Sequence, residues 1–207
     1  MNIKKLSKQV LLIIVGQLFI SLCVSMQIVV NLGLDPLGVF NSGIANIFNT
    51  TYGMGTFYAN VVAFILIIIL DKRYINLATL LSLFVVSGTT GFIVPLLQQL
   101  FGSDPSLFVR IILLVSSCFI LAFGYVIYVG ADRGVAPLDA FAELITDKYS
   151  YDYKVVKIVA DSTYVILGFL LGGSVGVATI IITILVGPII GWFKKTISPS
   201  ITDFVEH

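Results

Sequence analysis

Long apolar stretches alternate with short polar segments along the whole chain. A helix needs roughly 20 apolar residues to cross a hydrocarbon core of ~30 Å. Stretches that approach or exceed this length lie at 10–30, 56–70, 77–97, 107–130, 155–171 and 175–193. The second and fifth are near the lower limit, so we expect them to stand upright or to use flanking residues. The pattern predicts an all-α fold, a polytopic membrane bundle with six transmembrane helices.

A repeat of glycine and proline positions divides the chain into two halves. Its four matched positions in the first half, Gly33, Pro36, Leu37 and Phe40, recur 101 residues later (134 − 33 = 101) as Gly134, Pro137, Leu138 and Phe141. In the same register, Asn60 matches Asp161 (161 − 60 = 101). Paired segments of this kind, interrupted by glycine and proline, indicate a transport site when they occur in two halves of a membrane protein.

Three predicted spans in each half have a geometric consequence, because an odd number of crossings reverses the direction of the chain. The second half therefore lies upside-down relative to the first, which predicts a 3+3 inverted-topology repeat. We assign repeat 1 to residues 1–100, repeat 2 to residues 101–195 and a short cytoplasmic tail to residues 196–207. Together they form a single membrane domain, and the substrate site of such a plan lies between the halves.

Two shorter segments, 36–49 and 137–147, look helical but are too short to cross the bilayer. Asp35 is suited to cap the first one and Pro36 to occupy its first turn. In the second, Ala136 offers no capping side chain before Pro137. Two interpretations remain open. The segments are re-entrant half-helices whose N-termini face a cavity and favour an anionic or polar group, or they are amphipathic helices that lie in the membrane interface.

The basic residues indicate the orientation in the membrane. Eleven of the twelve Lys and Arg residues fall on one side of the six predicted spans, Arg110 being the exception. The positive-inside bias then makes both termini cytoplasmic. Apolar residues form 58% of the chain and the mean hydropathy is +1.06, so the lipid bilayer is the expected surrounding. The net charge of +1 gives no indication of a nucleic-acid partner. The first apolar run is too long for the core of a signal peptide, so we expect a retained helix.

Asp161 is the one acid predicted to lie clearly within a span, where a charge is costly and usually functional. The alternative is a local pair with Lys157 one turn earlier, whose side chain can reach the interface. Two glutamines lie in the first span. We assign Gln17 to hydrogen bonding between helices and Gln27, which is close to the 31–36 loop, to the site.

These observations predict a polar cavity between the halves. Its substrate-binding candidates are Gln27, Asp35, Pro36, Asn60, Pro137, Asp139 and Asp161. Small-x-x-x-small patterns at 87–91, 168–172 and 187–191 predict close helix packing within the bundle or against a second copy, so a homodimer is a further expectation. Tyrosines near the predicted span ends, including Tyr52 and Tyr153, are assigned to interfacial belts.

Enzymatic chemistry is not expected. His207 is the single histidine, and Cys23 and Cys118 fall inside predicted spans, so neither a metal site nor a disulfide is expected. No phosphate-binding loop and no nucleophile elbow occurs, and no cofactor is expected. Three functions remain: a secondary transporter that moves an unidentified small polar solute by alternating access, a non-transporting membrane regulator or scaffold, and the substrate-binding subunit of a larger transporter.

The motif of residues 33–37, its echo at 134–139 and the polar pair Asn60 and Asp161 resemble the YczE/YyaS/YitT group of bacterial integral membrane proteins. The resemblance covers essentially the whole chain. It implies a multi-pass protein of the bacterial cytoplasmic membrane, and it implies no particular substrate.

Overall fold

The computed structural model describes residues 3–206, and within this range all regular structure is helical. His207, the single histidine of the sequence, lies outside the described residues. Eight α-helices and one 3-10 turn follow one another, with the bounds α1 Ile3–Val30, α2 Pro36–Ile47, α3 Tyr52–Leu70, η1 Lys72–Tyr74, α4 Leu77–Phe101, α5 Leu107–Gly130, α6 Pro137–Tyr149, α7 Tyr153–Leu170 and α8 Val177–Glu206. The two short predicted helices therefore exist as α2 and α6.

Within residues 3–206, five helices are long and apolar enough to cross a membrane: α1, α3, α4, α5 and α8. The chain is thus an all-helical integral membrane protein with several spans. The remaining predicted span corresponds to α7, which has 18 residues and carries Lys154, Lys157 and Asp161, so composition alone does not distinguish it as a span. Helix α8 is longer than predicted, because it continues through Pro199 to Glu206.

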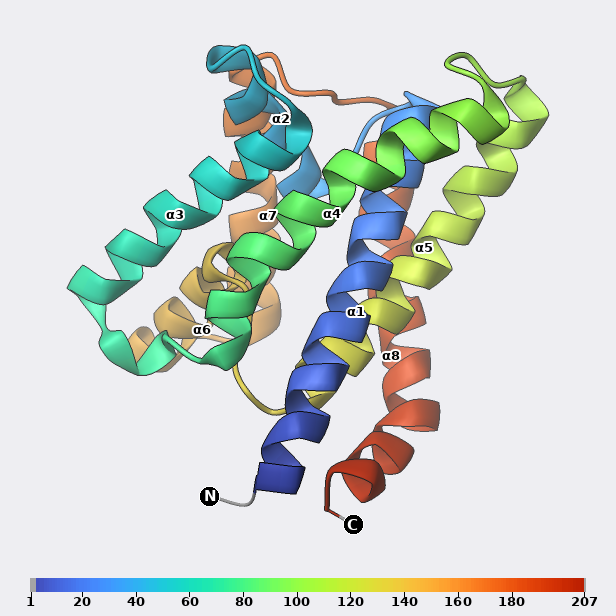
Figure 1. Ribbon diagram of the computed structural model, residues 1–207. Coiled ribbons are helices and arrows are strands. Elements are labelled where there is room, and N and C mark those ends of the chain that lie inside the picture. Colours follow the sequence, from blue (N-terminus) through green and yellow to red (C-terminus); the bar gives the residue numbers. More distant parts are fainter. Residues whose placement is uncertain (1–2, 207) are drawn as a thin grey trace.

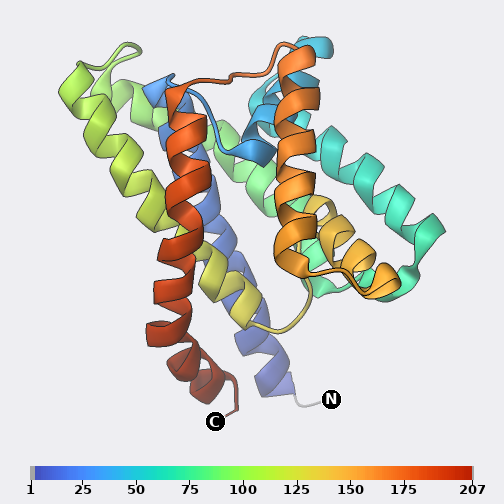
Figure 2. The same cartoon turned by 180° about the vertical axis from the view of Figure 1, so that it is seen from behind.

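The helices form two groups that share α4 (Figures 1 and 2). In the first group α5 packs against α1 and α8, and α4 packs against α1. In the second group the short helices α2 and α6 each pack against both α3 and α7. A core cluster that includes Met26, Val30, Leu113, Leu114 and Ile182 holds the first group together. The two groups contact each other where α3 packs against α4.

Both short helices return to the end of the bundle from which their preceding loop enters. In Figure 2 the loop after α1 descends into the bundle and α2 then runs back to the same end. The loop after α5 enters from the opposite end, and α6 runs back toward it. The first turns of α1 and the last turns of α8 lie together at the end that carries α6 (Figure 1).

The backbone conformation repeats with the sequence. Positive φ angles occur at Asn31 (53°) and Asp132 (52°), two residue types that tolerate this region. They recur at Gly33 (108°) and Gly134 (83°), and again at Asn49 (47°) and Ser150 (55°). Each pair is 101 residues apart, as 132 − 31 shows.

Matched hydrogen bonds also tie each half to the other. The amide of Ala178 donates to the carbonyl of Leu32 at 2.9 Å, and the amide of Ala78 donates to the carbonyl of Arg133 at 3.1 Å. The loop before each short helix is therefore held by the first turn of the last long helix in the opposite half. A side chain on Gly33 would collide with Gly176, whose amide nitrogen would lie 2.5 Å from the new Cβ.

One packing contact differs between the halves. Helix α3 packs against α4, where Gly53 lies so close to the carbonyl of Ser87 that a Cβ would overlap it. The corresponding helices α7 and α8 have no comparable packing. The prediction that small residues pack α4 is correct at 87–91, because a Cβ on Gly53 would lie 3.9 Å from the amide nitrogen of Gly91 as well. On α8 it is wrong within the described chain, because a Cβ at Gly187 or Gly191 would meet no atom within 4 Å.

At 168–172 the same prediction is correct for Gly168. A Cβ added there would lie 2.6 Å from the backbone of Val39, so the backbones of α7 and α2 are in direct contact at this point.

Candidate functional site

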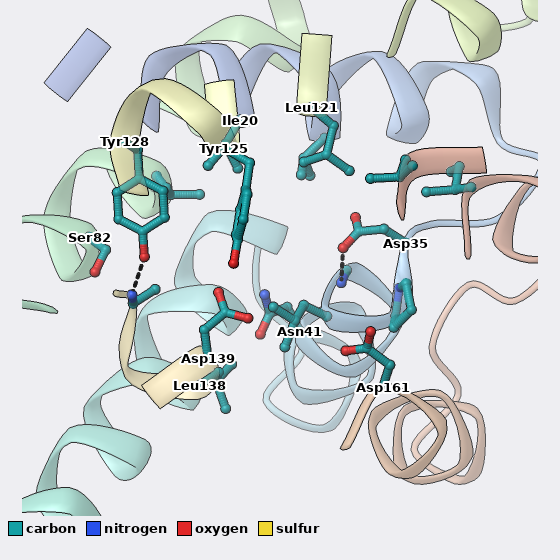
Figure 3. Close-up of a pocket in the computed structure, with 18 of the residues that line it drawn as sticks. Ile20, Asp35, Asn41, Ser82, Leu121, Tyr125, Tyr128, Leu138, Asp139 and Asp161 are labelled. Carbon is teal, nitrogen blue, oxygen red and sulfur yellow. Dashed lines mark hydrogen bonds between the residues drawn. The ribbon is translucent and has the colours of Figure 1, made fainter. Parts of the chain in front are cut away.

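A cavity of about 360 Å³ lies between the two groups of helices, and we call it the central cavity. Every α-helix from α1 to α8 contributes at least one lining residue. Side chains from both halves therefore face the same space. Figure 3 shows Asp35, Asp139 and Asp161 around Asn41, although the three carboxylates come from three different segments.

The structure brings most of the predicted site residues to this cavity. Its lining includes Asp35, Pro36, Asn60, Asp139 and Asp161, whereas Gln27 and Pro137 lie behind it. Gln27 is fully buried. Its side-chain oxygen accepts from the amide of Asp35 at 3.0 Å, and its amide group donates to the sulfur of Cys23 at 3.1 Å. Gln27 thus holds the loop that carries Asp35.

Asp35 caps α2 as predicted, and one of its oxygens remains without a partner. Oδ2 accepts from the amide of Gly38 at 3.3 Å, and Oδ1 is buried without a hydrogen bond. Asp35 lies in the loop outside the long apolar helices. Burial raises the pKa of this carboxyl from its ordinary 3.8 to about 6, an effect that the amide of Gly38 reduces and the carboxylate of Asp161 increases.

The start of α6 is built differently. The amide of Ala136 donates to the hydroxyl of Tyr128, and the hydroxyl of Tyr164 donates to the carbonyl of Leu138 at 2.8 Å. No side chain caps this helix, in agreement with the prediction for Ala136. Asp139 stands in its first turn, where a carboxylate interacts favourably with the positive end of the helix dipole.

Lys157 joins two of the cavity carboxylates. Its ammonium group lies 2.8 Å from Asp161 Oδ1, which confirms the local pair, and 3.0 Å from Asp139 Oδ1, which sequence spacing did not reveal. The three side chains are between 12% and 27% exposed. The second bond connects α6 to α7 across a gap of 18 residues in the chain (157 − 139). One ammonium group thus serves two carboxylates, and the cluster keeps a formal charge of −1 (1 − 2).

Neutral polar side chains in the wall lack partners. Buried atoms without a hydrogen bond include Gln17 Oε1 and Nε2, Asn41 Oδ1, Thr56 Oγ1 and Asn60 Oδ1. The orientation of Asn60 is fixed, because its Nδ2 donates to the carbonyl of Thr56 at 2.9 Å. The assignment of Gln17 to bonding between helices is therefore wrong: it is 1% exposed and faces the cavity unpaired.

Sequence reasoning missed several members of this wall. Thr56 lies one turn before Asn60 on the same helix face, which was an available signal. Tyr52 and Tyr153 line the cavity together with Tyr125 and Tyr128, so the assignment of the first two to interfacial belts is incomplete. Among the described residues no group of three or more His, Cys, Asp or Glu side chains is arranged to hold a metal ion.

Comparison with known proteins gives a family and two relatives. A model for a "Family of unknown function (DUF6198)" matches residues 7–195. An uncharacterized protein of Haemophilus influenzae is 26% identical over 167 residues, which cover 81% of this chain and 74% of that protein. The uncharacterized membrane protein YczE of Bacillus subtilis is 24% identical over 162 residues, which cover 77% and 72%. The resemblance drawn from the repeated motif is thereby confirmed. No solved structure matches the chain.

Proposed function

The chain belongs to the DUF6198 family of unknown function, and we propose that it is a secondary transporter that moves a small polar solute by alternating access between two inverted halves. The observation that carries the proposal is the central cavity, which is lined from both halves and contains buried polar atoms without partners. Solute sites in transporters built from inverted repeats lie at this place, between the halves and near the midplane.

The proposed topology has six spans arranged as a 3+3 inverted repeat, with α2 and α6 as re-entrant helices and both termini in the cytoplasm of a bacterial cell. Support comes from the positive φ angles that recur at 31 and 132 and at 33 and 134. The matched hydrogen bonds of Ala178 and Ala78 support it as well. Helix α7 is the sixth span in this proposal, because Lys157 and Asp161 line the cavity and so turn away from lipid.

The difference between the two halves suggests how the site changes its exposure. Helices α3 and α4 are packed at Gly53, whereas α7 and α8 have no comparable contact, and Lys157 and Lys194 on them line the cavity. In the proposed topology both lysines lie toward the cytoplasm, so we assign the described conformation as inward-facing. The opposite state has α7 packed on α8 and α3 moved away from Ser87, which is an exchange of conformations between the repeats.

Flux through purified protein in proteoliposomes tests the function. We expect uptake of a solute from a broad panel to respond to a pH or Na⁺ gradient and to disappear in Asp161→Asn. The matched control is Asp203→Asn, which changes an exposed acid on α8 outside the cavity, and it should transport normally. If no solute or gradient produces flux while deletion of the protein alters the behaviour of a partner, a regulator or scaffold replaces the transporter proposal.

A further inference from the structure

Most of the unpaired atoms of the central cavity are oxygens, and Nε2 of Gln17 is the unpaired donor among them. Asp35 Oδ1, Asn41 Oδ1, Thr56 Oγ1 and Asn60 Oδ1 are buried oxygens that accept no hydrogen bond. They belong to the first half of the chain, in the 31–35 loop, α2 and α3. A buried polar group normally has a partner, so a set without one within the chain is a place where a ligand or water binds. Asn41, Thr56 and Asn60 are each at least nine-tenths buried, at 5%, 3% and 6% exposure.

From this geometry we propose that the central cavity binds a small organic cation with N–H donors, a primary or secondary ammonium compound, with Asp35 as its counter-ion. The proposal rests on the transporter function only for the movement of that compound, since binding is measurable without flux. Asp35 forms no salt bridge within residues 3–206, whereas Asp139 and Asp161 share Lys157. Asp35 is therefore the cavity carboxylate without an ammonium partner in this part of the chain.

An anionic solute does not fit the same residues. The lining has three carboxylates, at Asp35, Asp139 and Asp161, against the ammonium groups of Lys157 and Lys194, which leaves a formal charge of −1 (2 − 3). The helix N-termini offer an anion little, because Asp35 already caps α2 and Asp139 stands in the first turn of α6. An added anion would meet like charge at both short helices.

The need for N–H donors follows from the neutral acceptors. Nδ2 of Asn60 is held by the carbonyl of Thr56, so Oδ1 is directed away from its own helix and can only accept. An ammonium group donates up to three hydrogen bonds, which suits a wall that offers several acceptor oxygens. A quaternary ammonium carries charge without any donor and would leave these oxygens unpaired.

The size and lining of the cavity indicate an organic ligand rather than a bare metal ion. Its volume of about 360 Å³ falls within the range of about 300–1,000 Å³ that is typical of small-molecule sites. Tyr52, Tyr125, Tyr128 and Tyr153 contribute to the wall together with aliphatic side chains. Tyrosine rings accommodate an alkyl body and attract a cation to their faces.

Calorimetric titration of the purified full chain in nanodiscs tests the proposal. The probes are butylammonium, tetramethylammonium and butyrate, each as a sodium or chloride salt, with sodium chloride as the blank. We expect butylammonium to bind at least tenfold more tightly than either other ion. Asp35→Asn should weaken butylammonium at least tenfold. Asparagine caps a helix as well as aspartate does, so this variant keeps the start of α2.

A second variant separates donor recognition from charge. Thr56→Val preserves the shape of the side chain and removes Oγ1, so it should weaken butylammonium several-fold and leave tetramethylammonium unchanged. Asp203→Asn should change neither. Butyrate or sodium binding more tightly than butylammonium would overturn the proposal, as would equal affinities in wild type, Asp35→Asn and Thr56→Val. Butylammonium binding without flux leaves this inference standing and removes the transporter, whereas flux of another solute without amine binding does the reverse.

Discussion

Replacement of Gly124 by alanine tests how closely α1 and α5 cross. A Cβ on Gly124 would lie 2.7 Å from the carbonyl oxygen of Gly16 and 2.7 Å from the Cβ of Phe19. Ordinary van der Waals contact begins near 3.4 Å, so the helices must separate by roughly 0.7 Å (3.4 − 2.7). The obstructing atoms are backbone and Cβ atoms, and no side-chain rotation relieves the overlap.

The expected cost combines two opposing effects. A separation of ~0.5–1 Å forfeits a quarter to a half of the dispersion attraction at each contact that it opens, and overpacking of a tight core costs about 1–3 kcal/mol. Alanine returns about 0.5–1 kcal/mol because glycine is a poor helix former. We therefore expect Gly124→Ala to lower the free energy of unfolding by about 0.5–2 kcal/mol.

Unfolding of purified protein by SDS in mixed micelles, followed by helical circular dichroism, measures this difference. The matched control is Gly191→Ala on α8, where the added Cβ meets no atom within 4 Å. It should leave stability unchanged or raise it by about 0.5–1 kcal/mol. If Gly124→Ala proves as stable as Gly191→Ala, the close crossing of α1 and α5 is refuted.

Four further outcomes are expected. Asp35 has a pKa of about 6, and the charged groups that act on it are Asp161 and Lys157. Because the carboxyl is protonated below this pKa, butylammonium affinity should fall about tenfold per pH unit below 6 and level off above it. A pH-independent affinity in calorimetry would contradict this. Since the folded pKa is raised, this carboxyl favours the folded state less as the pH rises from 3.8 to 6, and Asp35→Asn should remove that slope from SDS unfolding curves. Lys157→Met should destabilise the protein by about 1–3 kcal/mol, less than the ~3–5 kcal/mol of a fully buried pair, and Asp161→Asn in the same chain should recover part of the loss. Reporter fusions at Thr51 should read as external, and a cytoplasmic signal would refute the proposed topology.

The sequence was sufficient where local rules decide the structure. Apolar length predicted the long helices, and the pairing of a capping Asp35 with Pro36 predicted the start of α2. The i,i+4 spacing of Lys157 and Asp161 predicted their ion pair. Helix ends were harder to predict from the sequence. Helix α8 continues to Glu206, because neither of the two prolines inside it ends the helix.

Contacts between distant segments were beyond sequence reasoning. The bond from Lys157 to Asp139 joins two helices whose relative orientation depends on tertiary packing. Gln17 was misassigned because the sequence does not distinguish a polar residue that faces a neighbouring helix from one that faces a cavity. The glycines at 187 and 191 were misread for a similar reason: the small-x-x-x-small pattern permits close contact without specifying a neighbour.

The hydrogen bonds that tie each half to the other have a consequence for folding. The carbonyl of Leu32 can accept its hydrogen bond only after Ala178 has been synthesised, 146 residues later (178 − 32). Until then the loop that carries Asp35 has no fixed shape from this contact, even though α1 is already complete. The loop at Arg133 differs, since its partner Ala78 precedes it in the chain. The loop of the first half therefore obtains this hydrogen bond only once the start of α8 has been synthesised, and a chain truncated before α8 lacks it.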